Sequence, residues 1–205
     1  MLCTDTSGSS LSFTVVENTD RKLKELYSQT FPAQGRMNEA FFGCLDGFFA
    51  KASQKGRTVA AKNIAEWVCI TGPGSFTGIR IGLAALSGIT LGLGKKLAGL
   101  SSLDAAALIS GRDRVRVAAR LRMNEYAVKS YDFSTGGYSA VELQELYPPD
   151  GDTVFINGKI NTKGYECLSK AIIDPRVFDF IGSASPVYVK KSEAEINFDK
   201  KSAGI

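Results

Sequence analysis

The sequence of 205 residues contains no histidine, and this absence excludes several kinds of catalysis. Ser-His-Asp and Cys-His catalysis, proton transfer by imidazole and zinc binding through histidine all need at least one His side chain. Any such chemistry would have to come from another chain. Net charge is also small, because 25 Lys and Arg oppose 21 Asp and Glu and leave +4. This excess permits contact with nucleic acid or an anionic partner without indicating either.

Cysteine pairs and targeting signals are also lacking. The four cysteines form no Cys-x-x-Cys pair and stand in apolar stretches, which is typical of reduced thiols in a protein core. The first ten residues, MLCTDTSGSS, have no cationic segment and reach Asp5 too early for a signal peptide. We therefore expect a cytoplasmic protein, and the 44% hydrophobic and 22% charged residues are those of an ordinary globular chain.

Residues 75–94 are long and apolar enough to raise the alternative of a membrane span. Their only charge is Arg80, but glycines and threonines lower the apolarity, and the sequence has no second span of this kind. A helix buried inside an α/β domain explains the same composition, and we favour this interpretation.

Hydrophobic periodicity and turn residues predict two similar α/β halves. In the first half, strands are expected at 1–5, 11–17, 23–29, 66–71 and 97–100, and helices at 38–53, 75–93 and 103–110. In the second half, strands are expected at 115–123, 125–133, 138–143 and 153–157, and a weak helix at 164–172. The predicted fold class is therefore α/β, with an N-terminal subdomain over 1–100 and a smaller C-terminal subdomain over 101–205.

The turn between the fourth strand and the second helix reads GPGSFTGIRIG, from Gly72 to Gly82. Backbone N–H groups at such a turn can bind an anion. The turn does not match G-x-G-x-x-G, because Thr77 stands at the third glycine position, and it lacks the P-loop pattern. A phosphate site and a tight structural turn both stay open, and the structural turn is favoured.

The helix at 75–93 carries a stripe of small residues. Each interior glycine costs about 1 kcal/mol relative to alanine, so a compensating contact is expected. The stripe falls within an arc of roughly 120°, which predicts a groove that a neighbouring helix enters closely. Its members are Gly78, Gly82, Ala85, Gly88 and Gly92.

The helix at 38–53 is apolar over an arc of roughly 200°, about twice what one buried face requires. One side, which includes Phe41 and Leu45, can face the core. Phe42 and Phe49, seven residues apart, are expected to form an exposed aromatic ridge that contacts a partner. A wholly internal core is the alternative.

Arginines alternate with apolar residues along the strand expected at 115–123. Because neighbouring side chains of a strand point to opposite faces, these arginines share one face. That face is either solvated or a contact surface for RNA phosphates or an acidic partner. The arginines are Arg112, Arg114, Arg116, Arg120 and Arg122.

Five blocks of the sequence carry a family resemblance. They are TDTSGSS, GPGSFTGIRIGLAALSGITLG, LAGLSSLDAAA, RMNEYAVKSY and PVYVKK. Together they resemble the TsaB (YeaZ) family, the dimerisation subunit of the bacterial complex that makes threonylcarbamoyladenosine in tRNA. GPGSFTG followed by R-x-G is the most specific block, and the resemblance extends over nearly the whole chain.

The resemblance implies the fold of the actin-like ATPase, sugar kinase and heat-shock ATPase superfamily, with two ribonuclease H-like subdomains of which the C-terminal one is reduced. It also implies a non-catalytic assembly subunit that supports threonylcarbamoyl transfer to adenosine 37 of tRNA. The expected partners are a TsaD-like catalytic paralogue, a TsaE-like ATPase and, through the complex, tRNA. ATP and a metal ion are expected in the partner, and no cofactor or metal in this chain. A homodimer is possible when the chain is alone.

In such complexes the two subunits pair through helices that correspond here to 38–53 and 75–93. The partner contact implied by the resemblance therefore involves the aromatic and small residues of these two helices. The expected interface residues are Phe41, Phe42, Leu45, Phe49, Gly78, Gly82 and Ala85.

Asp5, Thr6, Ser7 and Gly8 resemble the first phosphate loop of the superfamily. A second Asp-Gly loop should open the second subdomain, and residues 118–125 (AARLRMNE) contain none. We therefore expect a vestigial nucleotide loop and no turnover by the chain alone. The alternative function is a divergent ATPase or phosphotransferase. A metallopeptidase is excluded because the sequence has no histidine or other plausible ligand cluster.

Overall fold

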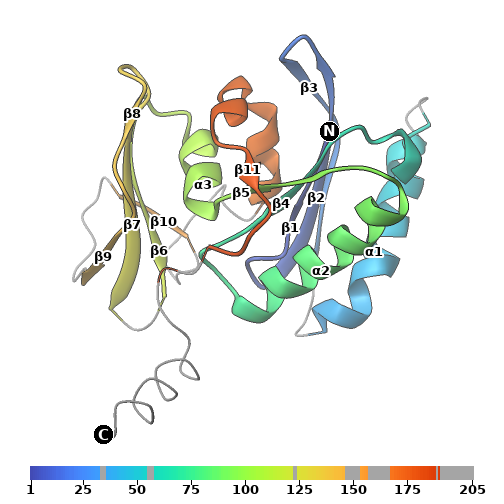
Figure 1. Ribbon diagram of the computed structural model, residues 1–205, viewed down its shortest axis with the longest axis horizontal. Helices are drawn as coiled ribbons and strands as arrows, with labels where there is room; N and C mark the ends of the chain where they lie inside the picture. The colour runs from blue at the N-terminus through green and yellow to red at the C-terminus, as the bar shows by residue number, and fades with distance from the viewer. Residues whose placement is uncertain are drawn as a thin grey trace, which may run out of the picture.

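The computed structural model describes residues 1–32, 36–54, 58–121, 124–145, 153–156, 167–187 and 189. These residues form two β-sheets and several helices arranged in layers (Figure 1). From right to left in Figure 1, the layers are two long helices, the first sheet, a middle layer of short helices and the second sheet.

The first sheet has six strands in the order β11-β5-β4-β1-β2-β3. Its strands are β1 (Leu2–Asp5), β2 (Ser10–Thr19), β3 (Lys22–Pro32), β4 (Trp67–Ile70), β5 (Leu97–Leu100) and β11 (Gly182–Ser183). β1, β4 and β5 are parallel, whereas β2 is antiparallel to β1 and β3. β4 is buried along its length, and its continuous apolar run WVCI is typical of a strand covered on both faces.

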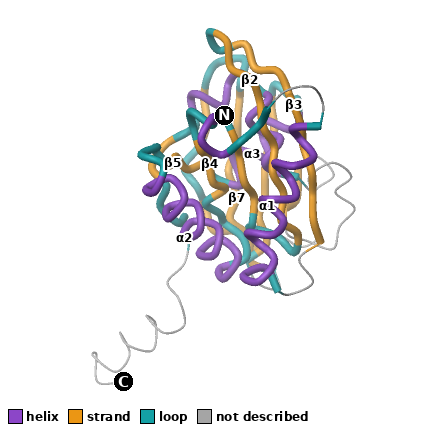
Figure 2. Tube along the Cα trace, turned by 90° about the vertical axis from the view of Figure 1, so that its right-hand side faces the viewer, coloured by secondary structure: helices purple, strands orange, loops and turns teal. Residues whose placement is uncertain are grey.

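Two long helices, α1 (Met37–Ser53) and α2 (Phe76–Gly92), lie side by side on the outer face of the first sheet (Figures 1 and 2). Both agree with the helices predicted from sequence to within one residue at each end. Their buried residues are Met37, Phe41, Leu45, Phe48 and Ala52 of α1 and Gly78, Ile79, Gly82, Leu83, Leu86 and Thr90 of α2. Within the described ranges, no helix has both the length and the apolarity that a bilayer span requires.

The second sheet is a smaller version of the first. Its strands are β6 (Arg114–Arg120), β7 (Glu125–Asp132), β8 (Gly137–Tyr138), β9 (Glu142–Glu145) and β10 (Thr153–Ile156). β6 pairs antiparallel with β7 and parallel with β10, just as β1 pairs antiparallel with β2 and parallel with β4. The repeated pairing agrees with the prediction of two similar α/β halves. The predicted boundary between residues 100 and 101 stays a prediction.

The middle layer fills the space between the sheets. It contains α3 (Ser102–Ser110) and the short 3-10 helices η2 (Leu168–Ile173) and η3 (Pro175–Asp179), while a further short helix, η1 (Ala61–Asn63), precedes β4. α3 is buried from Ser102 to Leu108, which explains why this segment is apolar on all sides. Its side chains share one core with the inner faces of both sheets, including Ile70 and Val117, and with Ile172 of η2.

A buried ion pair connects α3 to the second sheet. Lys129 Nζ of β7 lies 2.6 Å from Asp104 Oδ1 of α3, and each side chain is only 11% exposed. Tyr131 Oη donates a second hydrogen bond to the same oxygen at 2.7 Å. Burial, together with the neighbouring Asp104 carboxylate, raises the pKa of Tyr131 far above its usual range, so the phenol remains a donor. The Lys129 ammonium also lies 4.3 Å from the ring centroid of Tyr138.

A cluster of hydroxyl groups holds η2 against the first sheet. Ser169 Oγ lies 3.0 Å from Ser12 Oγ and 2.9 Å from Thr14 Oγ1 on β2. The Cys167 thiol joins the cluster at 3.2 Å from Ser169 Oγ. Burial alone would raise the pKa of Cys167, but hydrogen bonds from Ser169 and neighbouring hydroxyls outweigh it and lower the pKa below the usual value. The buried hydroxyls therefore satisfy one another across two segments that are far apart in sequence.

The structure departs from the predicted elements in the second half. The strand expected at 138–143 is two short strands, because β8 and β9 pair with different stretches of the same edge of β7. The weak helix expected at 164–172 is the 3-10 helix η2 in its described part, and residues 164–166 lie outside the described ranges. β11 was not predicted, since two residues carry no periodic pattern.

Candidate functional site

The Asp5 loop follows β1 and points into the middle of the molecule. Asp5 is only 6% exposed, and its Oδ1 accepts hydrogen bonds from Ser7 N at 2.7 Å and Ser7 Oγ at 2.6 Å. The backbone of Leu168 at the start of η2 hydrogen-bonds the same carboxylate. Burial raises the pKa of Asp5 above its ordinary value, and the hydrogen bonds from Ser7 and Leu168 offset this only in part.

The rest of the chain closes the Asp5 loop. Ser75 N donates to Ser7 O at 2.6 Å, which ties the loop to the start of α2. Thr6 is buried against α2, where a Cβ added at Gly82 would lie 2.3 Å from Thr6 Oγ1. In the expected vestigial nucleotide loop of Asp5, Thr6, Ser7 and Gly8, the polar groups of Asp5 and Ser7 are bonded within the chain, whereas Thr6 Oγ1 is buried without a hydrogen-bond partner among the described residues. Whether this loop is vestigial stays a prediction.

The pKa of Asp5 yields a test by pH. Because the folded protein binds the Asp5 proton more tightly than the unfolded chain, ionisation of Asp5 lowers the free energy of unfolding. This penalty is complete above the raised folded pKa and disappears below the ordinary value of 3.8. Relative to Asp5→Asn, the unsubstituted protein should therefore gain stability as the pH falls from about 7 toward 4. Melting temperatures of both proteins along this pH series check it, and a relative loss on acidification contradicts it.

Polar groups of the Gly72 turn before α2 also form hydrogen bonds within the chain. Gly72 has a φ of +98°, and Ser102 binds the turn by donating from N to Gly72 O at 2.8 Å and from Oγ to Pro73 O at 2.6 Å. Ser75 Oγ accepts from Gly78 N at 3.2 Å and caps α2. The start of α2 therefore has a cap from its own sequence, and the arrangement agrees with a tight structural turn.

Metal binding has little support in the same region. Among the residues that the structure describes, no three His, Cys, Asp or Glu side chains come together as ligands of a metal ion. The thiols of Cys3 and Cys69 lie near Asp5, and burial raises the pKa of both. Such thiols are protonated and chemically inert at neutral pH.

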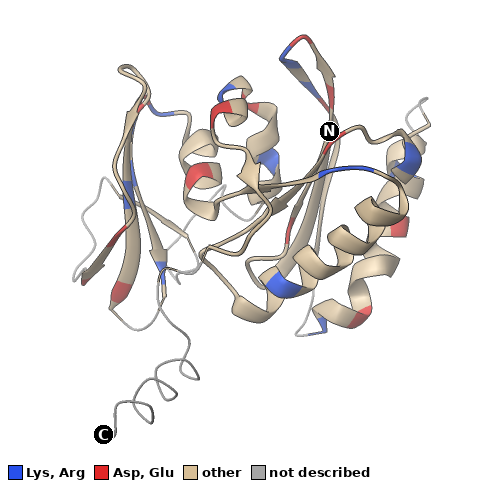
Figure 3. Cartoon of the chain, in the orientation of Figure 1, with Lys and Arg blue, Asp and Glu red and all other residues tan. Residues whose placement is uncertain are grey.

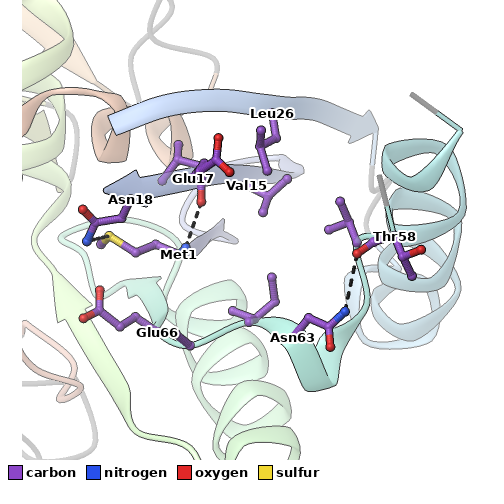
Figure 4. A pocket seen from close by; sticks show the side chains of 12 residues that line it. Met1, Val15, Glu17, Asn18, Leu26, Thr58, Asn63 and Glu66 are labelled. Atoms are coloured by element: carbon purple, nitrogen blue, oxygen red, sulfur yellow. Dashed lines mark hydrogen bonds between the residues drawn. The ribbon is translucent and has the colours of Figure 1, made fainter. Parts of the chain in front are cut away.

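A hollow of about 310 Å³ lies at the other end of β1, beside η1 (Figure 4). Val15, Leu26 and Ile64 contribute apolar walls, and Glu17 and Glu66 contribute carboxylates. No Lys or Arg is among its described lining residues. The N-terminal ammonium of Met1 also lines the hollow and donates to Val16 O at 2.9 Å.

The outward faces of α1 and α2 expose large apolar side chains, which we call the α1/α2 outer face. Phe42 is 56% exposed, Phe76 44% and Leu91 84%. Gly88 and Gly92 lie on the same helix as Leu91, and no atom would lie within 4 Å of a Cβ added at either position. Exposed apolar residues beside glycines allow a second protein to approach closely.

The predicted interface residues separate into exposed and buried groups. Phe42 is exposed as predicted, whereas Phe49 is half-buried, with its ring centroid 6.4 Å from that of Trp67. The prediction of an aromatic ridge made of two exposed phenylalanines is therefore wrong. Phe41 and Leu45 are 0% and 4% exposed, so the structure places them in the core rather than at a surface. Ala85 is half-buried.

The predicted groove at Gly78 and Gly82 is filled from within the chain. A Cβ at Gly78 would lie 2.1 Å from Thr6 O, and one at Gly82 would meet the Thr6 side chain. The element that approaches α2 closely is therefore the Asp5 loop and not a neighbouring helix. The prediction that these two glycines contact a partner is wrong, because the Asp5 loop of the same chain covers them.

Arg114, Arg116 and Arg120 of β6 lie on the outer face of the second sheet, as the alternation predicts. Val115, Val117 and Ala119 of β6 belong to the core, so the even-numbered residues of β6 face the other way. Arg112 and Arg114 are exposed, and Arg116 and Arg120 are half-buried. Arg122 lies outside the described residues. Figure 3 shows basic residues along this sheet.

The buried ion pair of Asp104 and Lys129 was not predicted from the sequence. Asp104 and Lys129 stand in apolar segments 25 positions apart, and only the fold brings them together. A charged residue within an otherwise apolar helix such as LDAAAL is a signal that could have indicated a buried partner.

Residues 50–128 match the family model of TsaD, tRNA N6-adenosine threonylcarbamoyltransferase. The solved structure of YeaZ from Pseudomonas aeruginosa is similar with a TM-score of 0.65 at 16% identity, over 92% of this chain and 98% of that chain. A second structure, of an uncharacterized protein with similarity to peptidase YEAZ from Pseudomonas aeruginosa, is similar with a TM-score of 0.60 at 21% identity, over 73% of this chain and 69% of that chain. No curated protein matches.

At these identities the two solved structures show a shared fold. The predicted resemblance to a YeaZ (TsaB)-like protein is confirmed at the level of the fold.

Proposed function

We propose that this chain is a non-catalytic subunit of an assembly that modifies tRNA with threonylcarbamoyladenosine, and that it pairs with a TsaD-like catalytic partner through α1 and α2. The fold of YeaZ over nearly the whole chain and the TsaD family match at 50–128 support this role. The observation that carries the proposal is the α1/α2 outer face, which exposes Phe42, Phe76 and Leu91 although both helices already contribute other apolar side chains to the core.

The α1/α2 outer face has the chemistry of a protein interface. Phe42 and Leu91 are large apolar anchors, and Gly88 permits close approach of a partner helix. Arg80 lies 3.8 Å from the ring centroid of Phe76 and adds a cationic group at the same surface. A TsaD-like partner, or a second copy of the chain when it is alone, would bury these residues.

The closed Asp5 loop supports the absence of catalysis in this chain. In the proposed assembly, ATP and the metal ion belong to the TsaD-like partner, and a TsaE-like ATPase is a further component. The alternative, a divergent ATPase or phosphotransferase, would need Asp5 to reach a nucleotide, yet Ser7 and Leu168 already bond its carboxylate.

Truncating two exposed anchors tests the pairing. Phe42→Ala with Leu91→Ala should weaken association with the TsaD-like partner by about 2 kcal/mol or more, which is about 30-fold in Kd. The melting temperature should change little, because both side chains are mostly outside the core. Sedimentation velocity of the purified pair over a concentration series measures the Kd.

A matched control removes exposed apolar groups elsewhere. Val141→Ala with Leu143→Ala truncates side chains that are 39% and 53% exposed at the second sheet, and pairing should be unchanged. Normal pairing by the Phe42/Leu91 variant, or equal loss in the control, contradicts the proposed interface. ATP hydrolysis that scales with the purified chain and disappears in Asp5→Ala would favour the enzyme alternative.

A further inference from the structure

A carboxylate lies within the apolar side of α1 that faces outward. The exposed positions of α1 recur three and four residues apart, so they form one side of the helix. Phe42, Asp46 and Ala50 are all exposed and follow one another at intervals of four residues. Side chains at this spacing are neighbours on a helix surface, with about 5–6 Å between their Cβ atoms. Asp46 therefore belongs to the α1/α2 outer face, next to the Phe42 anchor.

Local helix chemistry does not explain a charge at Asp46. The positions three and four residues away on either side carry only Phe, Gly and Ala, so α1 offers no cation at the spacing of a helical ion pair. Asp46 also lies in the interior of α1, whereas the helix dipole favours a carboxylate in the first turn, where Glu39 stands. Among the residues that the structure describes, Asp46 forms no ion pair.

The cations of α1 and α2 lie away from Asp46. Arg36 and Lys51 stand at the two ends of α1, roughly 15 Å and 7.5 Å from Asp46 along the helix axis. The Lys51 ammonium lies 6.0 Å from the ring centroid of Phe31, on the side of α1 that faces β3. The guanidinium of Arg80, in the first turn of α2, lies 3.8 Å from the ring centroid of Phe76.

A partner can approach Asp46 closely. Gly43 and Gly47 flank it on α1, and no atom lies within 4 Å of a Cβ added at either position. A surface that covers the Phe42 anchor therefore also covers Asp46 and removes its water. A carboxylate that loses its water is costly unless a cation pairs with it.

We propose that Asp46 selects the partner of the α1/α2 outer face, by pairing with an Arg or Lys that the TsaD-like partner presents to α1. This inference rests on the proposed function and deepens it. Apolar anchors such as Phe42 and Leu91 fit many apolar surfaces, whereas Asp46 rejects any surface that leaves it without a cation. A second copy that packs the same stretch of α1 on this one would bring two Asp46 carboxylates together, which disfavours self-pairing in that arrangement.

The experiment measures the Kd of the chain with the TsaD-like partner from the same source by isothermal titration calorimetry. Asp46→Asn keeps the size and polarity of the side chain, and it should weaken pairing by about 30-fold or more, because the partner's cation is left buried without its carboxylate. Asp46→Lys should weaken pairing further, by about 100-fold or more, because two cations then face each other. The melting temperature of each variant should change little, since Asp46 is exposed in the chain alone.

Asp179→Asn and Asp179→Lys provide the matched controls. Asp179 is exposed on η3, in the middle layer, so the first sheet separates it from the α1/α2 outer face (Figure 1). The controls make the same changes of net charge and should leave the Kd unchanged. An equal loss of pairing in the controls would indicate general attraction by net charge and overturn the proposal.

Charge reversal in the partner provides the decisive test. Single Arg→Glu and Lys→Glu variants of the partner's surface are titrated with Asp46→Lys, and at least one should restore the Kd to within about tenfold of the unsubstituted pair. Absence of any rescue overturns the proposal. If the unsubstituted chain pairs with itself and Asp46→Asn weakens that pairing, a second copy supplies the cation, and the proposal is again overturned.

The outcomes for the anchors and for Asp46 are distinguishable. If Phe42→Ala with Leu91→Ala abolishes pairing while both Asp46 variants pair normally, only this inference is overturned and the proposed interface stands. If the unsubstituted chain does not bind the TsaD-like partner at all, the proposed function is overturned together with the inference that rests on it.

Discussion

Asp104→Leu is expected to lower the free energy of unfolding by about 3–5 kcal/mol, because it leaves the Lys129 ammonium buried without its carboxylate. Both side chains are 11% exposed, so water cannot take the place of Asp104. Tyr131 Oη loses its acceptor in the same variant. For a chain of this length, the loss corresponds to a melting temperature about 6–20 °C lower. Thermal and urea unfolding monitored by circular dichroism measure the change.

The double variant Asp104→Leu with Lys129→Met separates a buried unpaired charge from a general packing defect. Replacing both members of a buried ion pair by apolar residues is often neutral, so the double variant should recover most of the lost stability. Lys129→Met alone should cost less than Asp104→Leu, since Asp104 keeps the hydrogen bond from Tyr131. A double variant no more stable than Asp104→Leu would show that packing, and not charge, causes the loss.

Gly78→Ala is expected to destabilise the protein by about 3 kcal/mol through overpacking. The new Cβ would lie 2.1 Å from Thr6 O, a backbone atom that is fixed because Ser75 N donates to the next residue of the same loop. Either α2 or the Asp5 loop must shift. The melting temperature should fall by about 6–12 °C, which differential scanning calorimetry measures.

Gly88→Ala is the control in the same helix. No atom lies within 4 Å of its added Cβ, so the substitution gains only helix propensity and should stabilise by about 1 kcal/mol. The two alanine variants should therefore shift the melting temperature in opposite directions. Equal shifts would show that contact with Thr6 does not distinguish the two glycines.

The sequence predicts the first half of the fold well because its signals are local. Long amphipathic patterns define α1 and α2 to within one residue, and the buried run of β4 is bounded by clear turn residues. β8, β9 and β11 are short and depend on the strand beside them, so no pattern in their own residues could indicate where they begin and end.

The candidate site shows a different limit. A helical wheel separates Phe42 from Phe41, and the structure confirms that division. A helical wheel does not show which strand packs beside each side of a helix. It therefore could not predict that the ring of Trp67 on β4 contacts the ring of Phe49 on α1. For the same reason, it identified a close approach at Gly78 but assigned it to a helix instead of the loop at Thr6. Strand alternation placed Arg114, Arg116 and Arg120 on one face correctly, because it needs only one element.

β11 and η2 pack on the first sheet but come late in the sequence, so this sheet cannot be completed until most of the chain has been synthesised. A ribosome that adds about 5–20 residues per second needs roughly 4–17 s to advance from β5 to β11. During this interval β1 to β5 are already made, but η2 does not yet cover the buried hydroxyls of β2. The inner face of the nascent first sheet therefore stays uncovered until residues near the other end of the chain have been synthesised. A chaperone can bind this face during that interval.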